Sequence, residues 1–460
     1  MPRKRPETRH MAQSTLRTYS SRTSSARSGP SANPNIQSKG KRIMAGQFTN
    51  RKKLIMLASA VAEKMPYIKN ATSLFSEGEI ARKKYGHAMH GYLPDAGSVS
   101  QGLVAHPDKA HQVEITAYID NFNTAAEVDL WDELLNIEDF KKEIVDKKAG
   151  KLAREVQKAI MKQNMFRSNQ VVVKSAYGFD LLSEANSALE ELNVDGDKVD
   201  FQSPTGFGKI ANSGLAKFIP SEKMSDIYED SYLGQYAGAA CVNLPGCPIV
   251  DTTGMDAAPT ITAEVVKDAS NNIIGVKPFK TLTGSGTGSI IPGAPYKLSG
   301  LKIVDEGGIE TEQEYIVIPV SEVVYDEDGN RSEVVTIPEI RVTATGKAYG
   351  NPNAHIAASA ISAALSGSDV TFTLSPVLTA SKQYQVGQVR TVKSLSWDQY
   401  RFQDLPAAKQ DNVGTFDGVM TLKMQSAPEV LNGVSYFRID LPFCSKLWEP
   451  RQSVTTYVEL

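Results

Sequence analysis

The sequence predicts an α+β fold that is interrupted by a separate β-rich domain, and two patterns carry this prediction. Residues 136–163 read as one long helix with a single apolar stripe, and shorter strand and helix patterns flank it on both sides. Between residues 259 and 374 the pattern changes to short β-rich runs separated by Gly-, Asp- and Asn-rich turns. Consecutive strands of this kind are typical of a barrel or sandwich, so we expect a β-barrel domain inserted into an α+β body.

Charge is distributed unevenly along the 460 residues, although the formal net charge is only −2. Residues 1–43 hold ten Lys or Arg and one acidic residue, whereas the rest of the chain holds 40 basic and 51 acidic residues. A mildly acidic body is not typical of a dedicated nucleic-acid binder. The three cysteines have no disulfide-framework spacing and indicate reduced thiols, and no run is apolar enough to span a membrane.

Residues 1–43 are rich in Arg and Ser and almost free of apolar residues, which predicts disorder. Two interpretations remain open. The segment is either a basic tail that touches nucleic acid or a stretch upstream of a true translation start at Met44.

Residues 44–78 are expected to form an N-terminal arm with one amphipathic helix over 49–65, stopped by Pro66. A signal peptide is the alternative, because three basic residues at 51–53 precede the apolar run LIMLASAVA. The free cysteines and the regular apolar face of the helix favour the arm.

Residues 79–110 are rich in Gly, His and Lys and lack an apolar period, so we expect an extended loop that leads into a strand over 112–118. Four of the six histidines are here or next to it: His87, His90, His106 and His111. Their spacing fits no common metal site and no cysteine or carboxylate set accompanies them. We therefore predict a solvated loop and no metal.

The long helix starts at Asn136, whose side chain is a favourable N-cap. Two pairs, Glu138–Lys142 and Glu143–Lys147, have helical salt-bridge spacing. The apolar positions recur at three- and four-residue steps: Phe140, Ile144, Val145, Leu152, Ala153, Val156, Ile160 and Met161. At roughly 1.5 Å per residue the helix would be about 40 Å long, the length of a strut beneath a sheet.

After this helix the pattern predicts a strand over 170–174, a helix over 180–192 and a turn at 195–196. Beyond the β-rich domain the chain returns with strands over 418–424 and 431–440.

No motif for catalysis or cofactor binding stands out. The Gly-rich stretch 284–289 lacks the Lys-Ser/Thr ending of a phosphate-binding loop, and the acidic stretch 326–330 places its glycine too early for a calcium loop. We predict no catalytic residues, no cofactor and no metal, hence a structural protein and not an enzyme. A hydrolase is the remaining enzyme alternative.

Four stretches follow one another in a characteristic order: DFKKEIVDKKAGKLAREVQKAIMKQN, then SYLGQYAGAA followed by NLP, then AYGNPNAHIA, and finally SYFRIDLP. They resemble the spine helix, the turn before the insertion, part of the insertion domain and the peripheral strands of the major capsid proteins of tailed double-stranded DNA phages. The likeness is greatest to short-tailed Salmonella-phage-type coat proteins with an inserted β-domain. It covers about residues 44–460 and rests on the order of the stretches.

The resemblance implies the tailed-phage and herpesvirus-type major capsid fold. It divides the chain into an N-arm (44–78), an extended loop (79–110), a peripheral domain with the spine helix (111–170), an axial domain (171–253), the inserted β-domain (254–378), and an axial return with peripheral strands (379–460). The sequence departs from the family in two places. The arm is basic at 51–53 where relatives are more neutral or acidic, and residues 1–43 have no counterpart.

The resemblance also implies a function and partners. The chain would self-assemble as hexamers and pentamers into an icosahedral shell around packaged phage DNA, in the bacterial cytoplasm and then in the virion. Its partners would be itself, a separate scaffolding protein, the portal protein and double-stranded DNA, with no membrane. Contacts to neighbours are expected from the loop through Tyr85, His87, Met89 and Tyr92, and from the arm through Arg51, Lys52, Lys53, Leu54 and Leu57.

Two alternatives to a capsid protein remain. An encapsulin-type nanocompartment shell shares the fold but usually lacks a large inserted β-domain. An exported bacterial surface protein with a β adhesion domain would account for the signal-like segment.

Overall fold

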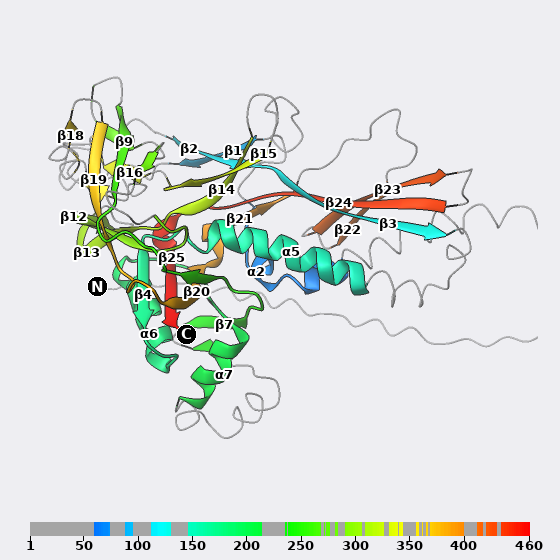
Figure 1. The fold of residues 1–460 in the computed structure, drawn as a ribbon, viewed down its shortest axis with the longest axis horizontal. Coiled ribbons are helices and arrows are strands. Elements are labelled where there is room, and N and C mark those ends of the chain that lie inside the picture. The colour runs from blue at the N-terminus through cyan, green and yellow to red at the C-terminus, as the bar shows by residue number, and fades with distance from the viewer. Residues whose placement is uncertain are drawn as a thin grey trace, which may run out of the picture. The chain divides into compact units, whose positions relative to one another are not determined.

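In the computed structural model, all residues that the structure describes belong to one unit, Phe48–Leu460 (Figure 1). They are 59–73, 88–94, 112–129, 146–213, 235–236, 238–267, 271, 273–276, 281–283, 290–305, 309–325, 331–338, 340–343, 356–357, 361, 365–366, 369–399, 412–416, 420–429 and 434–460.

The described part of the arm is a helical stretch at 59–63 followed by the short helix α2 (Pro66–Lys69). The prediction that the arm helix stops before Pro66 is confirmed, and Pro66 also occupies the first position of the next helix, α2. Proline suits that position since its missing N–H has no helical acceptor there. Residues 51–58, and with them the first half of the predicted arm helix, lie outside the described residues.

Strands β1 (Ala88–Pro94) and β2 (Gln112–Tyr118) form a two-stranded antiparallel sheet in which Ala88 lies opposite Tyr118. The predicted strand over 112–118 is confirmed. The expectation of a loop throughout 79–110 is wrong for 88–94. The sequence AMHGYLP has no regular alternation, and it is extended here because β2 supplies backbone partners along its whole length.

The next sheet has five strands: β3 (Asp120–Asp129), β24 (Val434–Leu447), β23 (Met420–Glu429), β22 (Asn412–Phe416) and β21 (Leu395–Asp398). The long strand β24 is central, with β3 on one edge and both β23 and β21 on the other. The helix α5 (Asp146–Asn164) packs against β3 and β24 (Figure 1). The predicted strut beneath a sheet is thus present over its described length.

Helix α5 has the predicted amphipathic pattern. The predicted apolar positions that the structure describes are all buried: Leu152, Ala153, Val156, Ile160 and Met161. The helix ends one residue later than expected, at Asn164. Residues 130–145 lie outside the description, so the predicted start at Asn136 stays a prediction.

A seven-stranded sheet follows the order β4-β25-β20-β5-β7-β6, with β8 also paired to β20. Its strands are β4 (Gln170–Lys174), β25 (Ser453–Glu459), β20 (Gln383–Thr391), β5 (Lys198–Gln202), β7 (Ala239–Asn243), β6 (Gln235–Tyr236) and β8 (Ile249–Asp251). Helix α6 (Phe179–Glu191) packs on β4 and β25. Helix α7 (Pro204–Asn212) follows β5 and is capped by the Ser203 hydroxyl, which accepts from Gly206 N.

Local predictions in this region are confirmed closely. The strand over 170–174 has the predicted bounds, and α6 begins and ends within one residue of the predicted helix. The predicted turn after it contains Gly196 at φ 122°, a left-handed backbone angle that favours glycine.

The inserted segment carries a nine-stranded sheet with the order β13-β12-β19-β9-β10-β16-β17, to which β11 and β18 add at β9 and β19. Strand β17 also packs on β12 and β13, so the two ends of the strand order lie close together. The strands are β9 (Thr260–Lys267), β10 (Ile273–Val276), β11 (Thr281–Thr283), β12 (Tyr296–Val304), β13 (Glu310–Val317), β16 (Ile340–Thr343), β17 (Ile356–Ala357), β18 (Leu365–Ser366) and β19 (Asp369–Pro376). A hairpin of β14 (Val320–Tyr325) and β15 (Arg331–Thr336) forms a sheet of its own.

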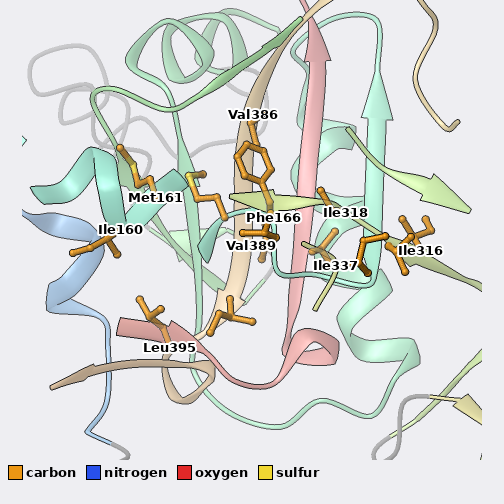
Figure 2. Close-up of a cluster of buried hydrophobic side chains, with 14 of the residues drawn as sticks. Ile160, Met161, Phe166, Ile316, Ile318, Ile337, Val386, Val389 and Leu395 are labelled. Atoms are coloured by element: carbon orange, nitrogen blue, oxygen red, sulfur yellow. The ribbon is translucent and has the colours of Figure 1, made fainter. Parts of the chain in front are cut away.

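One hydrophobic core joins the inserted segment to the rest of the unit. Figure 2 shows this packing, in which side chains of α5, β20 and the inserted segment lie together. The labelled residues are Ile160, Met161, Phe166, Ile316, Ile318, Ile337, Val386, Val389 and Leu395. Among the described helices, none combines the length and apolar character that a membrane crossing requires.

Candidate functional site

The structure separates the residues that the sequence proposed for contacts with neighbours. Met89 on β1 is buried in its own chain, whereas Tyr92 on the same strand is 49% exposed. Tyr92 is therefore accessible on the surface of this chain, and Met89 is covered. The other proposed contact residues lie outside the described residues: Tyr85, His87, Arg51, Lys52, Lys53, Leu54 and Leu57.

The histidine-rich stretch contains one described histidine. His90 faces Thr116 across the β1–β2 sheet, with 3.3 Å between His90 Nδ1 and Thr116 Oγ1. Within the described ranges no group of three or more metal-ligating side chains occurs. The three cysteines are free and buried.

A small cluster attaches the β1–β2 hairpin to the body. Met89, Ala117 and Cys444 form an apolar group separate from the main core, and the Cys444 thiol donates to Met89 Sδ at 3.2 Å. Burial raises the pKa of the Cys444 thiol well above its ordinary value. Beside this cluster, Lys446 Nζ donates to the Thr116 carbonyl at 2.6 Å. The hairpin is thus held by a few contacts at its base.

The β14–β15 hairpin is fixed at the same place by charge. The Glu322 carboxylate lies 2.8 Å from the Arg167 guanidinium and 3.9 Å from Lys446 Nζ. Burial alone would raise the pKa of Glu322, but Arg167 and Lys446 outweigh this effect and hold the pKa below its ordinary value. The three charges line a small polar cavity together with Tyr118 and Asp120.

Two exposed or half-exposed pairs complete this junction. Arg331 of β15 binds Asp120 at the start of β3 through two contacts of 3.3 and 3.1 Å. Glu333 pairs with Lys162 of α5 and accepts from the Ser321 hydroxyl. The inserted segment thereby contacts β2, β3, α5 and β24 through one hairpin. Residue spacing in the sequence does not predict these contacts, because the partners are far apart along the chain.

The arm is fastened to the seven-stranded sheet by Arg390 of β20. Its guanidinium is fully buried and lies against the rings of Tyr67 and Phe201, 4.9 and 5.0 Å from their centroids, and these two rings also contact each other with 5.0 Å between their centroids. It donates to the carbonyls of Tyr67 at 2.9 Å and Asn70 at 2.7 Å. The Tyr67 hydroxyl donates to Gln388 Oε1 at 2.7 Å, and burial raises the pKa of Tyr67 to about 12.

A short β-bridge continues the attachment of the arm. Thr72 lies parallel to Ser396 of β21, and its backbone exchanges hydrogen bonds with Leu395 O and Trp397 N at 2.9 Å. Thr72 therefore lies beside β21 of the five-stranded sheet.

A buried carboxyl stands in the middle of the seven-stranded sheet. Asp200 of β5 is fully buried, and Gln202 Nε2 donates to its Oδ1 at 3.0 Å. Its other oxygen has no partner in the described part of the chain. Because burial disfavours the charged form, the pKa of Asp200 rises to about 7.

Glu449 joins the inserted segment to the C-terminal strands. Its two oxygens accept from Arg341 of β16 at 2.9 Å and from Arg451 at 3.0 Å, and all three side chains are nearly inaccessible. Arg451 also donates to the Asp305 carbonyl at 2.7 Å and lies in the 3-10 turn η6 (Pro450–Gln452). A second 3-10 turn, η5 (Val392–Ser394), precedes β21. These arrangements hold segments in place, and among the described residues we find none that resembles a catalytic site.

Compared with known proteins, the sequence matches no protein-family model and no curated protein. Solved structures do match. A chain of Mycobacterium phage Che8 has 9% identity and a TM-score of 0.36, over 84% of this chain and 92% of that one. The head structure of Helicobacter pylori bacteriophage KHP40 has 9% identity and a TM-score of 0.40, over 86% and 91%. The capsid structure of the cyanophage P-SCSP1u has 10% identity and a TM-score of 0.39, over 84% and 85%.

Proposed function

We propose that the chain is a major capsid protein of a tailed double-stranded DNA phage, which assembles as hexamers and pentamers into the icosahedral shell. One observation carries the proposal, namely the order of elements along the chain. An arm, a two-stranded extension, a long helix under a sheet, an α/β segment, an inserted β-domain and returning strands follow one another. This is the order that the sequence resemblance implies.

The arrangement of apolar surface supports a shell protein. The β1–β2 hairpin rests on a cluster of only three buried residues, and Tyr92 projects from it with half of its surface exposed. Such an extension gains little stability from its own chain, so a neighbouring copy is the natural partner for its outer surface. In this proposal the five-stranded sheet with α5 is the peripheral domain and the seven-stranded sheet is the axial domain.

An exported surface protein fits the structure less well. Cleavage at the signal-like residues would fall after Ala62, and both Val61 and Ala62 are buried in the main core. Removal of this segment would strip Tyr67 and its neighbours of their packing partners. The proposed location is the bacterial cytoplasm during assembly and then the virion, with a separate scaffolding protein, the portal protein and packaged DNA as further partners.

Negative-stain microscopy of the purified full chain tests the proposal. We expect closed shells of capsid size, formed by the chain alone or with a co-expressed scaffolding protein. A chain that stays monomeric under both conditions contradicts the proposal. Shells that enclose protein cargo and no nucleic acid would assign the chain to encapsulin-type compartments.

A further inference from the structure

Helix α5 has one exposed face that does not pack against the other residues described by the structure. Ala153, Val156 and Ile160 point into the main core, where the helix packs against β24, β3 and β14. At about 100° per residue, the opposite face carries Lys147, Lys151, Arg154 and Lys158, all exposed. We call these four residues the α5 basic row.

The α5 basic row is straight and compact. Its four charges fall within an arc of roughly 60° and extend over about 17 Å along the helix axis. A fifth cation, Lys64, lies beside the row. Its Nζ is next to Gly150, 3.2 Å from where a β-carbon would be if residue 150 had a side chain. The exposed acidic residue Glu155 lies to one side of the row. From residue 146 to 164 the helix holds six basic and two acidic residues.

The row is not neutralised within the part of the chain that the structure describes. No salt bridge or hydrogen bond engages the side chains of its four residues there. Elsewhere the pattern differs. Lys162, one turn beyond the row, pairs with Glu333, and Lys174 pairs with Asp180 and Glu184. Four like charges side by side repel one another, so they favour a partner with many negative charges.

The chemistry of the row favours a phosphate backbone over a protein partner. A protein interface has a core of desolvated apolar side chains, and no large exposed apolar side chain of the described surface lies on α5. Duplex DNA offers one negative charge per about 1.7 Å of its axis, so a 17 Å segment presents roughly ten phosphates to a row of four cations.

We propose that the α5 basic row binds the phosphate backbone of double-stranded DNA without regard to base sequence. The inference deepens the proposed function, because it assigns the contact with packaged DNA to one helix face. Four phosphate contacts give weak binding at physiological salt, which an acidic body further limits. Binding of this strength would position the DNA and still allow it to dissociate.

The test compares full-length variants, so that the basic segment 1–43 contributes equally to each. Lys151→Gln, Arg154→Gln and Lys158→Gln are combined, because glutamine keeps helix propensity and removes the charge. Affinity for a short labelled duplex of random sequence is measured by fluorescence anisotropy over a series of salt concentrations. Loss of three contacts should make the slope of log K against log[salt] shallower by about 2.7. Between about 50 and 200 mM salt, the wild-type chain should lose roughly 40-fold more affinity than the variant.

The matched control changes the net charge equally at scattered exposed positions: Lys209→Gln, Lys267→Gln and Lys393→Gln. Its salt slope should remain within experimental error of the wild type. An unchanged slope in the α5 variant, or an equal change in the control, overturns the inference. Binding of poly-glutamate that depends on the row, without such dependence for DNA, would assign the row to an acidic protein partner and also overturn it.

Microscopy of the same variant separates this inference from the proposed function. Normal shells with an altered salt slope support both. A chain that never forms shells yet loses DNA affinity through the row contradicts the proposed function and leaves the inference standing. A thermal unfolding midpoint equal to that of the wild type establishes that the variant is folded.

Discussion

At the scale of single residues, Arg390 shows how one side chain can place a whole segment. Its guanidinium has no carboxylate partner among the described residues and instead binds backbone carbonyls of the arm while it lies against two aromatic rings. A planar, always charged group with several donors suits this role, and lysine does not. The arm therefore depends on a residue more than 300 positions later in the sequence.

Replacing Arg390 should destabilise the fold strongly. In Arg390→Met the carbonyls of Tyr67 and Asn70 remain buried without donors, so we expect a loss of about 3 kcal/mol or more in the free energy of unfolding. Urea unfolding followed by circular dichroism measures it, with the exposed Lys393→Met as the control. A loss below about 1 kcal/mol would mean that the arm is held mainly by its apolar packing.

Asp200 should make stability fall as pH rises. Its pKa in the folded state, about 7, lies above its ordinary value of 3.8. Between these values the folded state binds more protons than the unfolded state, so the free energy of unfolding decreases with pH in this window. Asp200→Asn removes the titrating group. The free energy of unfolding of the variant minus that of the wild type should increase between pH 4 and pH 8, by up to about 4 kcal/mol.

Thermal midpoints recorded across that pH range test this prediction. The thermal midpoints of the two proteins can differ by a constant amount at every pH, because the buried asparagine amide of the variant adds an N–H donor that needs an acceptor. A difference that does not vary with pH would show that Asp200 is ionised in the folded state.

At the scale of elements, the sequence predicted a helix or strand correctly where the apolar residues within that element recur at a regular period. The strands over 112–118 and 170–174 and the helix α6 were predicted almost to the residue, because alternation or helical period is strong there. Strand β1 was missed, since its extended shape comes from pairing with β2 and not from its own composition. The stop before Pro66 was predicted, but the start of α2 at the same residue was not, although proline is common at the first position of a helix as well as after its end.

The junction around Glu322 lay beyond sequence reasoning for a similar reason. Its charged partners Arg167 and Lys446 are separated from it by more than a hundred positions each, and only the tertiary fold brings them together. The contacts proposed for the extended loop remain a prediction. Of the two proposed loop residues that the structure describes, Met89 and Tyr92, Tyr92 is the exposed one.

Tyr92→Ser tests the extended hairpin if the chain forms shells as proposed. Tyr92 is half exposed and serine is tolerated at a solvent-facing strand position, so we expect the subunit to remain folded, which a thermal unfolding midpoint checks. Loss of an aromatic anchor at each interface should weaken every intersubunit contact by about tenfold and reduce the yield of closed shells. Val334→Ser, an exposed apolar position outside this hairpin, is the control. Equal shell yields from both variants would contradict the role of Tyr92.

At the scale of the whole unit, the inserted segment is bound to the body by buried charge as well as by apolar packing. Glu449 bridges Arg341 of the insert and Arg451 of the C-terminal region, and hairpin β14–β15 reaches α5 and β3. Segments connected in this way should unfold together.

Glu449→Gln tests this coupling. The substitution removes the carboxylate charge that faces the buried guanidinium groups of Arg341 and Arg451, which should cost about 3–5 kcal/mol and let the inserted strands open before the body. Hydrogen exchange read by mass spectrometry should then show faster exchange in β9 to β19 than elsewhere. Glu312→Gln, which breaks the exposed pair with Lys302, should change neither quantity. Uniform exchange in both variants would contradict the coupling.

The pairing of β24 with β3 and of β25 with β4 has a consequence for synthesis on the ribosome. Each of the two body sheets takes a central or near-central strand from residues 434–459, although its first strand appears before residue 175. Neither sheet can be completed until that segment has left the exit tunnel. A polypeptide released by a premature stop before residue 434 would therefore lack a strand of each sheet, and if the chain assembles as proposed, damaged messages would not supply defective subunits to the particle.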